Sequence, residues 1–90
     1  MCIELNLPIV NEKGLHARAS AKFVETVESF DAEAQVTRDG MTVSGDSIMG
    51  LLMLAASNGT TIDVKTNGAE AESLAQALED LVKGRFGEDA

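Results

Sequence analysis

The first nine residues alternate between apolar and polar side chains. The apolar positions are Ile3, Leu5, Leu7 and Ile9. A period of two with polar residues between predicts a strand that buries one face. Pro8 limits ladder pairing near the end of this strand, and a polar loop over residues 11–14 follows it.

The period becomes helical from Ala17 onward. Apolar residues fall at i, i+1, i+4 and i+7, namely at Phe23, Val24, Val27 and Phe30. Glu25 and Glu28 face away from them, as in a helix with one buried stripe. The pattern therefore predicts a first helix that begins at Ala17.

An Asp-Gly pair at 39–40 separates two further alternating segments, with Ala34 and Val36 before it and Met41 and Val43 after it. This arrangement favours a β-hairpin with a two-residue turn.

The polar run 44–47 ends the second of these strands, and either Asp46 or Ser47 can cap a helix that follows. We expect a short apolar helix to about Ala56, closed by the Asn-Gly pair at 58–59.

The last third of the chain predicts one strand and one helix. Ile62, Val64 and Thr66 alternate with polar residues, and a turn at 67–68 follows. Glu70 and Glu72 suit the first turn of the last helix. The expected buried stripe of this helix is Ala71, Leu74, Ala75, Leu78, Leu81 and Val82, and Lys83, Gly84 and Arg85 end it.

The predicted order is β-α-β-β-α-β-α, in a single domain over residues 1–90. Because every strand alternates, one sheet face should be covered by helices and the other left in water. We expect an α+β, two-layer open-faced sandwich with a four-stranded antiparallel sheet and no α/β crossover fold.

Composition excludes several classes of function. One cysteine and one histidine cannot build a zinc site, and no cofactor is implied. The free thiol of Cys2 fits the reducing cytoplasm, and the start MCIELNL has no secretory features. The longest apolar run, residues 48–56, is too short for membrane insertion, and a net charge of −8 argues against nucleic acid.

The charge is unevenly distributed. Lys13, Arg18 and Lys22 lie in a stretch without acids, so the rest of the chain carries 4 cations and 15 acids, a charge of −11. This positive segment suggests a bound anion or an acidic partner, although chance clustering explains it equally well.

The only histidine, His16, stands at or beside the N-cap of the first predicted helix. The helix field disfavours an imidazolium there, so we expect a neutral ring with a nucleophilic nitrogen. A phosphoryl group on that nitrogen would meet free N–H donors, and Arg18 could add a charge-assisted contact. A solvated helix-end histidine without a role is the alternative. Ser20 lies one turn away, but no third residue supports a hydrolase.

Two segments carry a family resemblance. GLHARAS at 14–20 resembles the active loop of HPr, the histidine-containing phosphocarrier of the bacterial phosphotransferase system. VSGDSIMGLLML at 43–54 resembles the regulatory region of the same family. The expected element order also fits, so the resemblance covers nearly the whole chain.

The resemblance implies a non-enzymatic, monomeric carrier. His16 would be phosphorylated on Nδ1 by enzyme I, itself charged by phosphoenolpyruvate, and would pass the group to EIIA-type proteins. Arg18 matches the family's active-site arginine. Ser47 matches the serine that an HPr kinase/phosphorylase modifies in some bacteria, where the neighbouring Asp46 would repel the new phosphate. Family docking residues match Ala17, Ala21, Ile48, Met49 and Leu52.

The second helix should therefore serve docking. Its expected buried stripe is Ile48, Leu51, Leu52 and Ala55. Met49 and Met53 lie beside that stripe and are expected to be exposed, where flexible side chains suit several partners.

The chain departs from the family pattern at Ala19, where the family usually has proline, and at Glu25 and Glu28, where many members carry lysines. The acids favour a regulatory or nitrogen-related branch over sugar uptake. A regulatory module that uses only Ser47 is one alternative. Another is an acyl carrier protein modified at Ser47, because Asp46-Ser47-Ile48 resembles its Asp-Ser-Leu motif, but acyl carriers are all-helical.

Overall fold

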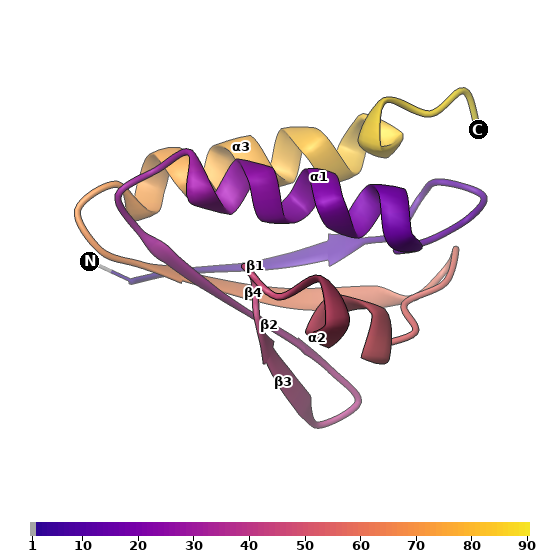
Figure 1. Cartoon of the computed structure of the whole chain (residues 1–90), viewed down its shortest axis with the longest axis horizontal. Coiled ribbons are helices and arrows are strands. Elements are labelled where there is room, and N and C mark those ends of the chain that lie inside the picture. Colours follow the sequence, from indigo (N-terminus) through magenta and orange to yellow (C-terminus); the bar gives the residue numbers. More distant parts are fainter. Residues whose placement is uncertain (1) are drawn as a thin grey trace.

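In the computed structural model, which describes residues 2–90, four strands form one antiparallel sheet covered by three helices (Figure 1). The elements are β1 (Cys2–Pro8), α1 (Ala17–Glu28), β2 (Glu33–Arg38), β3 (Met41–Ser44), α2 (Ile48–Met53), β4 (Thr61–Asn67), α3 (Ala71–Lys83) and a 3-10 turn, Arg85–Gly87. The strand order is β1-β4-β2-β3, with every pair antiparallel. The predicted α+β sandwich and its element order are confirmed.

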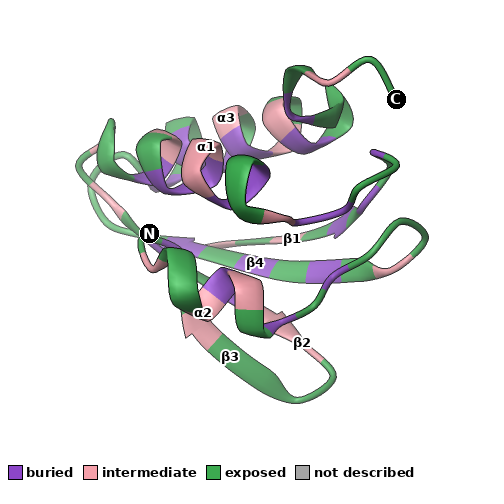
Figure 2. Cartoon of the chain, turned by 45° about the vertical axis from the view of Figure 1, so that its right-hand side comes forward, coloured by how far each residue is buried: buried purple, intermediate pink, exposed green. Residues whose placement is uncertain are grey.

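The alternation along β4 shows why the sheet has one covered face. Ile62, Val64 and Thr66 are buried, whereas Asp63 and Lys65 between them are exposed (Figure 2). Val64 pairs with a residue of β1 on one side and of β2 on the other, so β4 is an inner strand. Successive side chains point to opposite faces, and the polar set therefore leaves the second face in water.

Helices α1 and α3 lie side by side over the covered face of the sheet (Figure 1). Phe23 of α1 and Leu74 and Leu78 of α3 are completely buried. Each such side chain contributes about 1.5–3 kcal/mol by leaving water, so their burial holds both helices against the sheet. Leu81 is only half-buried, and Phe30 lies beyond the end of α1 rather than within it.

The β2–β3 hairpin has the turn that the Asp-Gly pair predicts. Asp39 and Gly40 have φ values of 50° and 78°. Two successive positive φ values are typical of a type I′ turn, whose twist matches that of the flanking strands.

Helix α2 differs from the prediction at its end and on its buried face. It stops at Met53 rather than near Ala56, because Ala55 adopts a left-handed backbone with φ 51°. Ala55 is exposed and Ile48 is 41% exposed, so the expected stripe was wrong for both, while Leu51 is buried. The Asn-Gly pair at 58–59 forms a separate turn after the helix.

None of the helices in residues 2–90 has the length and hydrophobicity needed to cross a membrane.

Candidate functional site

The loop between β1 and α1 is held close to the chain that follows α2. Leu15 is buried and its N–H donates to the carbonyl of Ala56 at 2.8 Å. Gly14 has φ +69°, and a Cβ on it would lie 2.6 Å from the same carbonyl oxygen. This close approach requires glycine at position 14, and it places the next residue but one, His16, at the start of α1.

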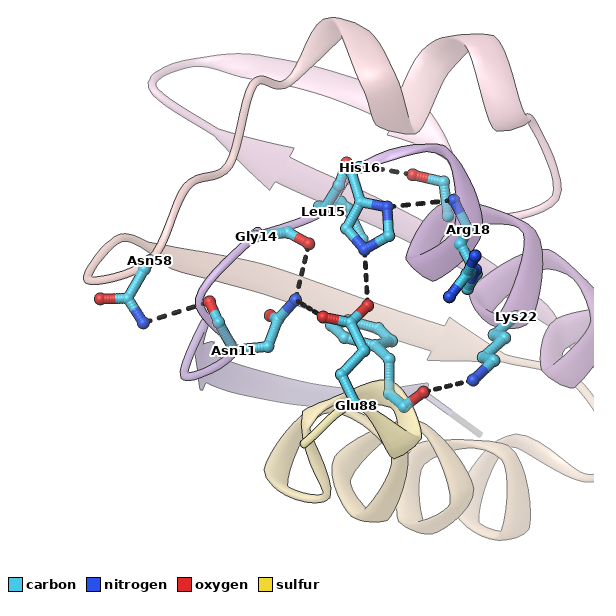
Figure 3. Close-up of polar contacts among 10 residues, drawn as sticks. Asn11, Gly14, Leu15, His16, Arg18, Lys22, Asn58 and Glu88 are labelled. Carbon is cyan, nitrogen blue, oxygen red and sulfur yellow. Dashed lines mark hydrogen bonds and ion pairs between the residues drawn. The ribbon is translucent and has the colours of Figure 1, made fainter. Parts of the chain in front are cut away.

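His16 is the N-cap of α1, with an extended backbone at φ −78° and ψ −175°. Its Nδ1 accepts a hydrogen bond from the Arg18 N–H at 3.3 Å (Figure 3). Its carbonyl accepts from the Ser20 N–H at 2.8 Å, which begins the helical hydrogen-bond series. The ring thus caps the helix in the way that a serine or aspartate side chain usually does.

The two contacts of the ring define its tautomer. Because Nδ1 accepts from a backbone N–H, it carries a lone pair. Nε2 lies 2.5 Å from Oε2 of Glu88, a carboxylate that can only accept when ionised, so Nε2 carries the proton (Figure 3). The Nδ1 lone pair therefore faces the N-terminus of α1, where it accepts the Arg18 N–H.

Glu88, in the tail that follows α3, completes the site, and the sequence pattern did not single it out. Its Oε1 accepts from Nδ2 of the buried Asn11 at 3.0 Å while Oε2 faces His16. The hydrogen bond from Asn11, followed by that from His16, lowers the pKa of the Glu88 carboxyl despite partial burial. The side chain is 14% exposed, compared with 28% for His16, so the ion lies largely out of water.

The tail is positioned by one buried aromatic residue. Phe86 is completely buried, and its carbonyl accepts from Lys22 Nζ at 2.5 Å (Figure 3). Arg85 and Phe86 both have left-handed backbones, with φ 58° and 55°. Each such residue costs about 1–2 kcal/mol, and the burial of Phe86, at about 1.5–3 kcal/mol, offsets part of the cost of the two. A lone aromatic between Gly84 and Gly87 was the available sequence signal for this turn.

The positive segment of the sequence is not isolated in space. Arg18 and Lys22 line a hollow of about 420 Å³ together with Glu12 and the tail residues 87–90. The acids of the tail therefore lie among these cations. Within residues 2–90 the Arg18 guanidinium makes no hydrogen bond or ion pair, so it is free to meet an incoming anion.

A second, shallower hollow joins His16 to the end of α2 and is lined by Leu52 and Ala55 among others. Beside it, Met49 is 70% and Met53 65% exposed, as predicted. Ala17 is exposed, and Ala21 and Leu52 are half-buried. Of the expected docking residues, Leu52 lines this hollow with His16, and Ala17 directly follows the histidine.

Ser47 is the N-cap of α2, which decides between the two caps that the sequence allowed. Its Oγ accepts from the Gly50 N–H at 3.0 Å, while Asp46 is engaged by the Ser44 hydroxyl. Ala19 is buried in the first turn of α1, and the helix begins at Ala17 without the usual proline. No cluster of three His, Cys, Asp or Glu side chains suited to a metal ion exists in the described residues.

Fold and site together define a small domain that presents one histidine on its surface, at a helix N-terminus. Residues 3–84 match the family model described as "PTS HPr component phosphorylation site". The chain belongs to the HPr family, the phosphocarrier proteins of the bacterial phosphotransferase system. The sheet and this membership overturn the acyl-carrier alternative.

Similar proteins cover nearly the whole chain. Phosphocarrier protein HPr of Neisseria meningitidis serogroup A is 48% identical over 86 residues, which are 96% of this chain and 97% of that protein. Phosphocarrier protein NPr of Shewanella violacea is 36% identical over 86 residues, which are 96% and 94%. The crystal structure of HPr-C-His from Thermoanaerobacter tengcongensis is similar at a TM-score of 0.93 and 36% identity, with 98% and 99% coverage.

Proposed function

We propose that the chain carries a phosphoryl group on Nδ1 of His16, received from phosphoenolpyruvate-charged enzyme I and passed to EIIA-type proteins. The observation that carries this proposal is the lone pair of Nδ1, which faces the Arg18 N–H at 3.3 Å. A lone pair in this position can attack phosphorus without first losing a proton. As the Nδ1–phosphorus bond forms, the bond between phosphorus and the donor breaks.

The start of α1 suits the phosphate that would result. The N–H groups of Ala17, Arg18 and Ala19 precede the first helical hydrogen bond, which the Ser20 N–H makes. Once Nδ1 is bonded to phosphorus, the Arg18 N–H loses its acceptor and can donate to a phosphate oxygen instead. The helix field stabilises a nearby anion by roughly 1–2 kcal/mol in favourable geometry, enough to hold the group without trapping it.

Arg18 adds the second contact. Its exposed guanidinium has five donors in a planar fork that matches phosphate oxygens. Because it makes no bond within the described residues, it can turn toward the phosphate without breaking one.

The partners would dock over α1 and α2. The surface consists of Ala17, Ala21, Ile48, Met49 and Leu52, with Met53 at its edge, and it adjoins the histidine through the shallow hollow. Small residues on α1 allow a close approach, and methionines adapt to partners of different shape. We propose that one surface serves donor and acceptors in turn, in a cytoplasmic monomer. Relatives named HPr and a relative named NPr both match the chain. That the chain belongs to a regulatory or nitrogen-related branch, rather than to one that feeds sugar uptake, is a further proposal.

Ser47 is proposed as a regulatory site for an HPr kinase/phosphorylase. Its hydroxyl is half-buried at the start of α2, directly before the exposed Ile48 and Met49. A phosphate there would place about two negative charges at the edge of the docking surface, beside Asp46. We therefore expect modification to weaken docking rather than to unfold the domain.

The decisive experiment is incubation with enzyme I and labelled phosphoenolpyruvate. Wild-type protein should gain one acid-labile phosphate, and His16→Asn should gain none. Asparagine keeps a helix-cap acceptor but offers no nucleophilic ring nitrogen, so this variant separates loss of chemistry from loss of fold. Circular dichroism checks that both proteins are folded. Label on His16→Asn would refute the assignment of His16.

A further inference from the structure

The carboxylate of Glu88 contacts the ring nitrogen that the transfer reaction does not use. Nε2 of His16 and Oε2 are 2.5 Å apart, and Nδ1 faces the opposite way, toward the start of α1 (Figure 3). The match to the family model ends at residue 84, so Glu88 lies outside the matched region. Its place at the histidine comes from the structure of this chain.

Glu88 is itself held from both sides. Asn11, completely buried, donates from Nδ2 to Oε1 at 3.0 Å and to the carbonyl of Gly14 at 2.8 Å. The same amide therefore ties the carboxylate to the loop that carries His16. On the tail side, the buried ring of Phe86 and the bond from Lys22 to its carbonyl fix the chain two residues earlier. A carboxylate held in this way is already in position before the reaction begins, so no entropy is lost in ordering it during the reaction.

We propose that Glu88 is a positioning residue for phosphoryl transfer, holding the Nε2 proton of His16 and balancing the charge that the ring gains. The inference rests on the proposed function of His16. It assigns to the tail a role in the chemistry beyond closing the fold.

The proton and charge balance show what the carboxylate would do. Attack by the Nδ1 lone pair forms the bond to phosphorus and leaves the ring with Nε2–H and a positive charge. Glu88 accepts the hydrogen bond from that cation, so the proton has no need to leave. When the phosphoryl group moves on, the electron pair of the broken bond returns to Nδ1 and the ring becomes neutral again. No proton is exchanged in either direction, and the protonated ring stays a good leaving group.

A purely structural role makes a different prediction, because glutamine could replace Glu88 as a spacer and hydrogen-bond partner. Its amide has nearly the same shape but no charge, and its single oxygen can accept from Nε2–H or from Asn11 Nδ2 but not from both. Glu88→Gln therefore removes the charge and one acceptor without emptying the site. Glu33→Gln is the matched control, since it neutralises an exposed glutamate that lies outside the hollow lined by Arg18.

The experiment measures the rate of labelling by enzyme I with labelled phosphoenolpyruvate, the rate of transfer onward to an EIIA protein, and the ¹⁵N–¹H spectrum of the unphosphorylated ring. We expect Glu88→Gln to slow both transfers roughly tenfold, as for loss of one charge-assisted hydrogen bond. We expect the wild-type Nε2 proton to resonate far downfield and exchange slowly, and Glu88→Gln to lose this signature. Glu33→Gln should match the wild type in all three measurements, and Glu88→Asp should recover part of the rate.

Two results would overturn the inference. One is wild-type rates together with an unchanged ring spectrum in Glu88→Gln. The other is an equal loss in Glu33→Gln, which would assign the effect to the net charge of the protein. If wild-type protein takes no label, the proposed function of His16 fails instead, and the ring spectrum still decides whether Glu88 holds the Nε2 proton.

Discussion

The molecule has two helix starts capped by a side chain that is a candidate for phosphorylation, and they differ in everything around the cap. His16 begins α1 and Ser47 begins α2, and each side chain accepts a backbone N–H of its own helix. At His16, the carboxylate of Glu88 contacts the second ring nitrogen, Nε2. Among residues 2–90 the Ser47 hydroxyl has Gly50 N–H as its only hydrogen-bond partner, so no base is ready to take its proton.

This difference separates a nucleophile that needs no base from one whose proton must be taken by a base that a partner supplies. The histidine offers a lone pair with its proton already held elsewhere. A serine hydroxyl must lose its proton before or during attack, and a kinase has to supply the base. In our proposal, the same helix-cap geometry therefore serves a carrier site at His16 and a regulatory target at Ser47.

The largest expected effect comes from a substitution in the loop that precedes the His16 cap. Gly14→Ala forces a left-handed alanine, about 1–2 kcal/mol, and adds a Cβ 2.6 Å from the Ala56 carbonyl oxygen, which costs roughly another 1–3 kcal/mol. We expect a loss of about 3 kcal/mol in the free energy of unfolding, measured by urea denaturation, together with a loss of His16 labelling.

Gly40→Ala is the control for Gly14→Ala. It also has a positive φ, 78°, but nothing lies within 4 Å of the added Cβ. Gly40→Ala should therefore lose only the stability that a left-handed alanine costs, and the labelling of His16 should be unchanged. If both variants lose the same stability, the close approach of the loop to the chain after α2 is not what holds His16.

A smaller effect is expected at the serine cap. Ser47→Ala removes the acceptor for the Gly50 N–H and should cost about 1 kcal/mol, or roughly 4–8 °C in the melting temperature of a domain of this size. Labelling of His16 by enzyme I should persist. Incubation with HPr kinase and ATP should add an acid-stable phosphate to wild-type protein and none to Ser47→Ala, so label on the variant would place the kinase site elsewhere.

The smallest effect is a pH dependence that only the histidine region should show. The pKa of Glu88 is lowered in the folded protein, chiefly by the bond from Asn11. Its stabilising contribution is therefore fully present above the ordinary glutamate range and is lost as pH falls through the lowered value. The stability difference between wild type and Glu88→Gln should shrink as pH falls below about pH 4.

Ser47→Ala supplies the comparison for that titration. Its cap contains no ionisable group, so the deficit of this variant should not change over the same pH window. A deficit of Glu88→Gln that stays constant to pH 3 would show that the carboxylate is not the group that holds the tail.

Prediction from sequence succeeded where the spacing of apolar residues follows from burial of one face of an element. Val64 and Lys65 alternate because one sheet face is covered, and that alternation is visible in the letters alone. The end of α2 was wrong because Ala55 takes a left-handed backbone that alanine rarely adopts, a tertiary effect with no local signal. Glu88 was missed for a related reason. The tail has no periodic pattern of apolar residues. Glu88 reaches His16 only because Phe86 is buried and the chain turns back at that point.

The contact between His16 and Glu88 joins residues 72 positions apart, and β1 pairs only with β4. On a ribosome that adds about 5–20 residues per second, the histidine is made several seconds before its carboxylate. During that interval the first half of the chain has neither the partner strand of β1 nor the counter-ion of the ring. In our proposal, His16 therefore reaches its full rate of phosphoryl transfer only after Glu88 has been translated and the tail has folded against it.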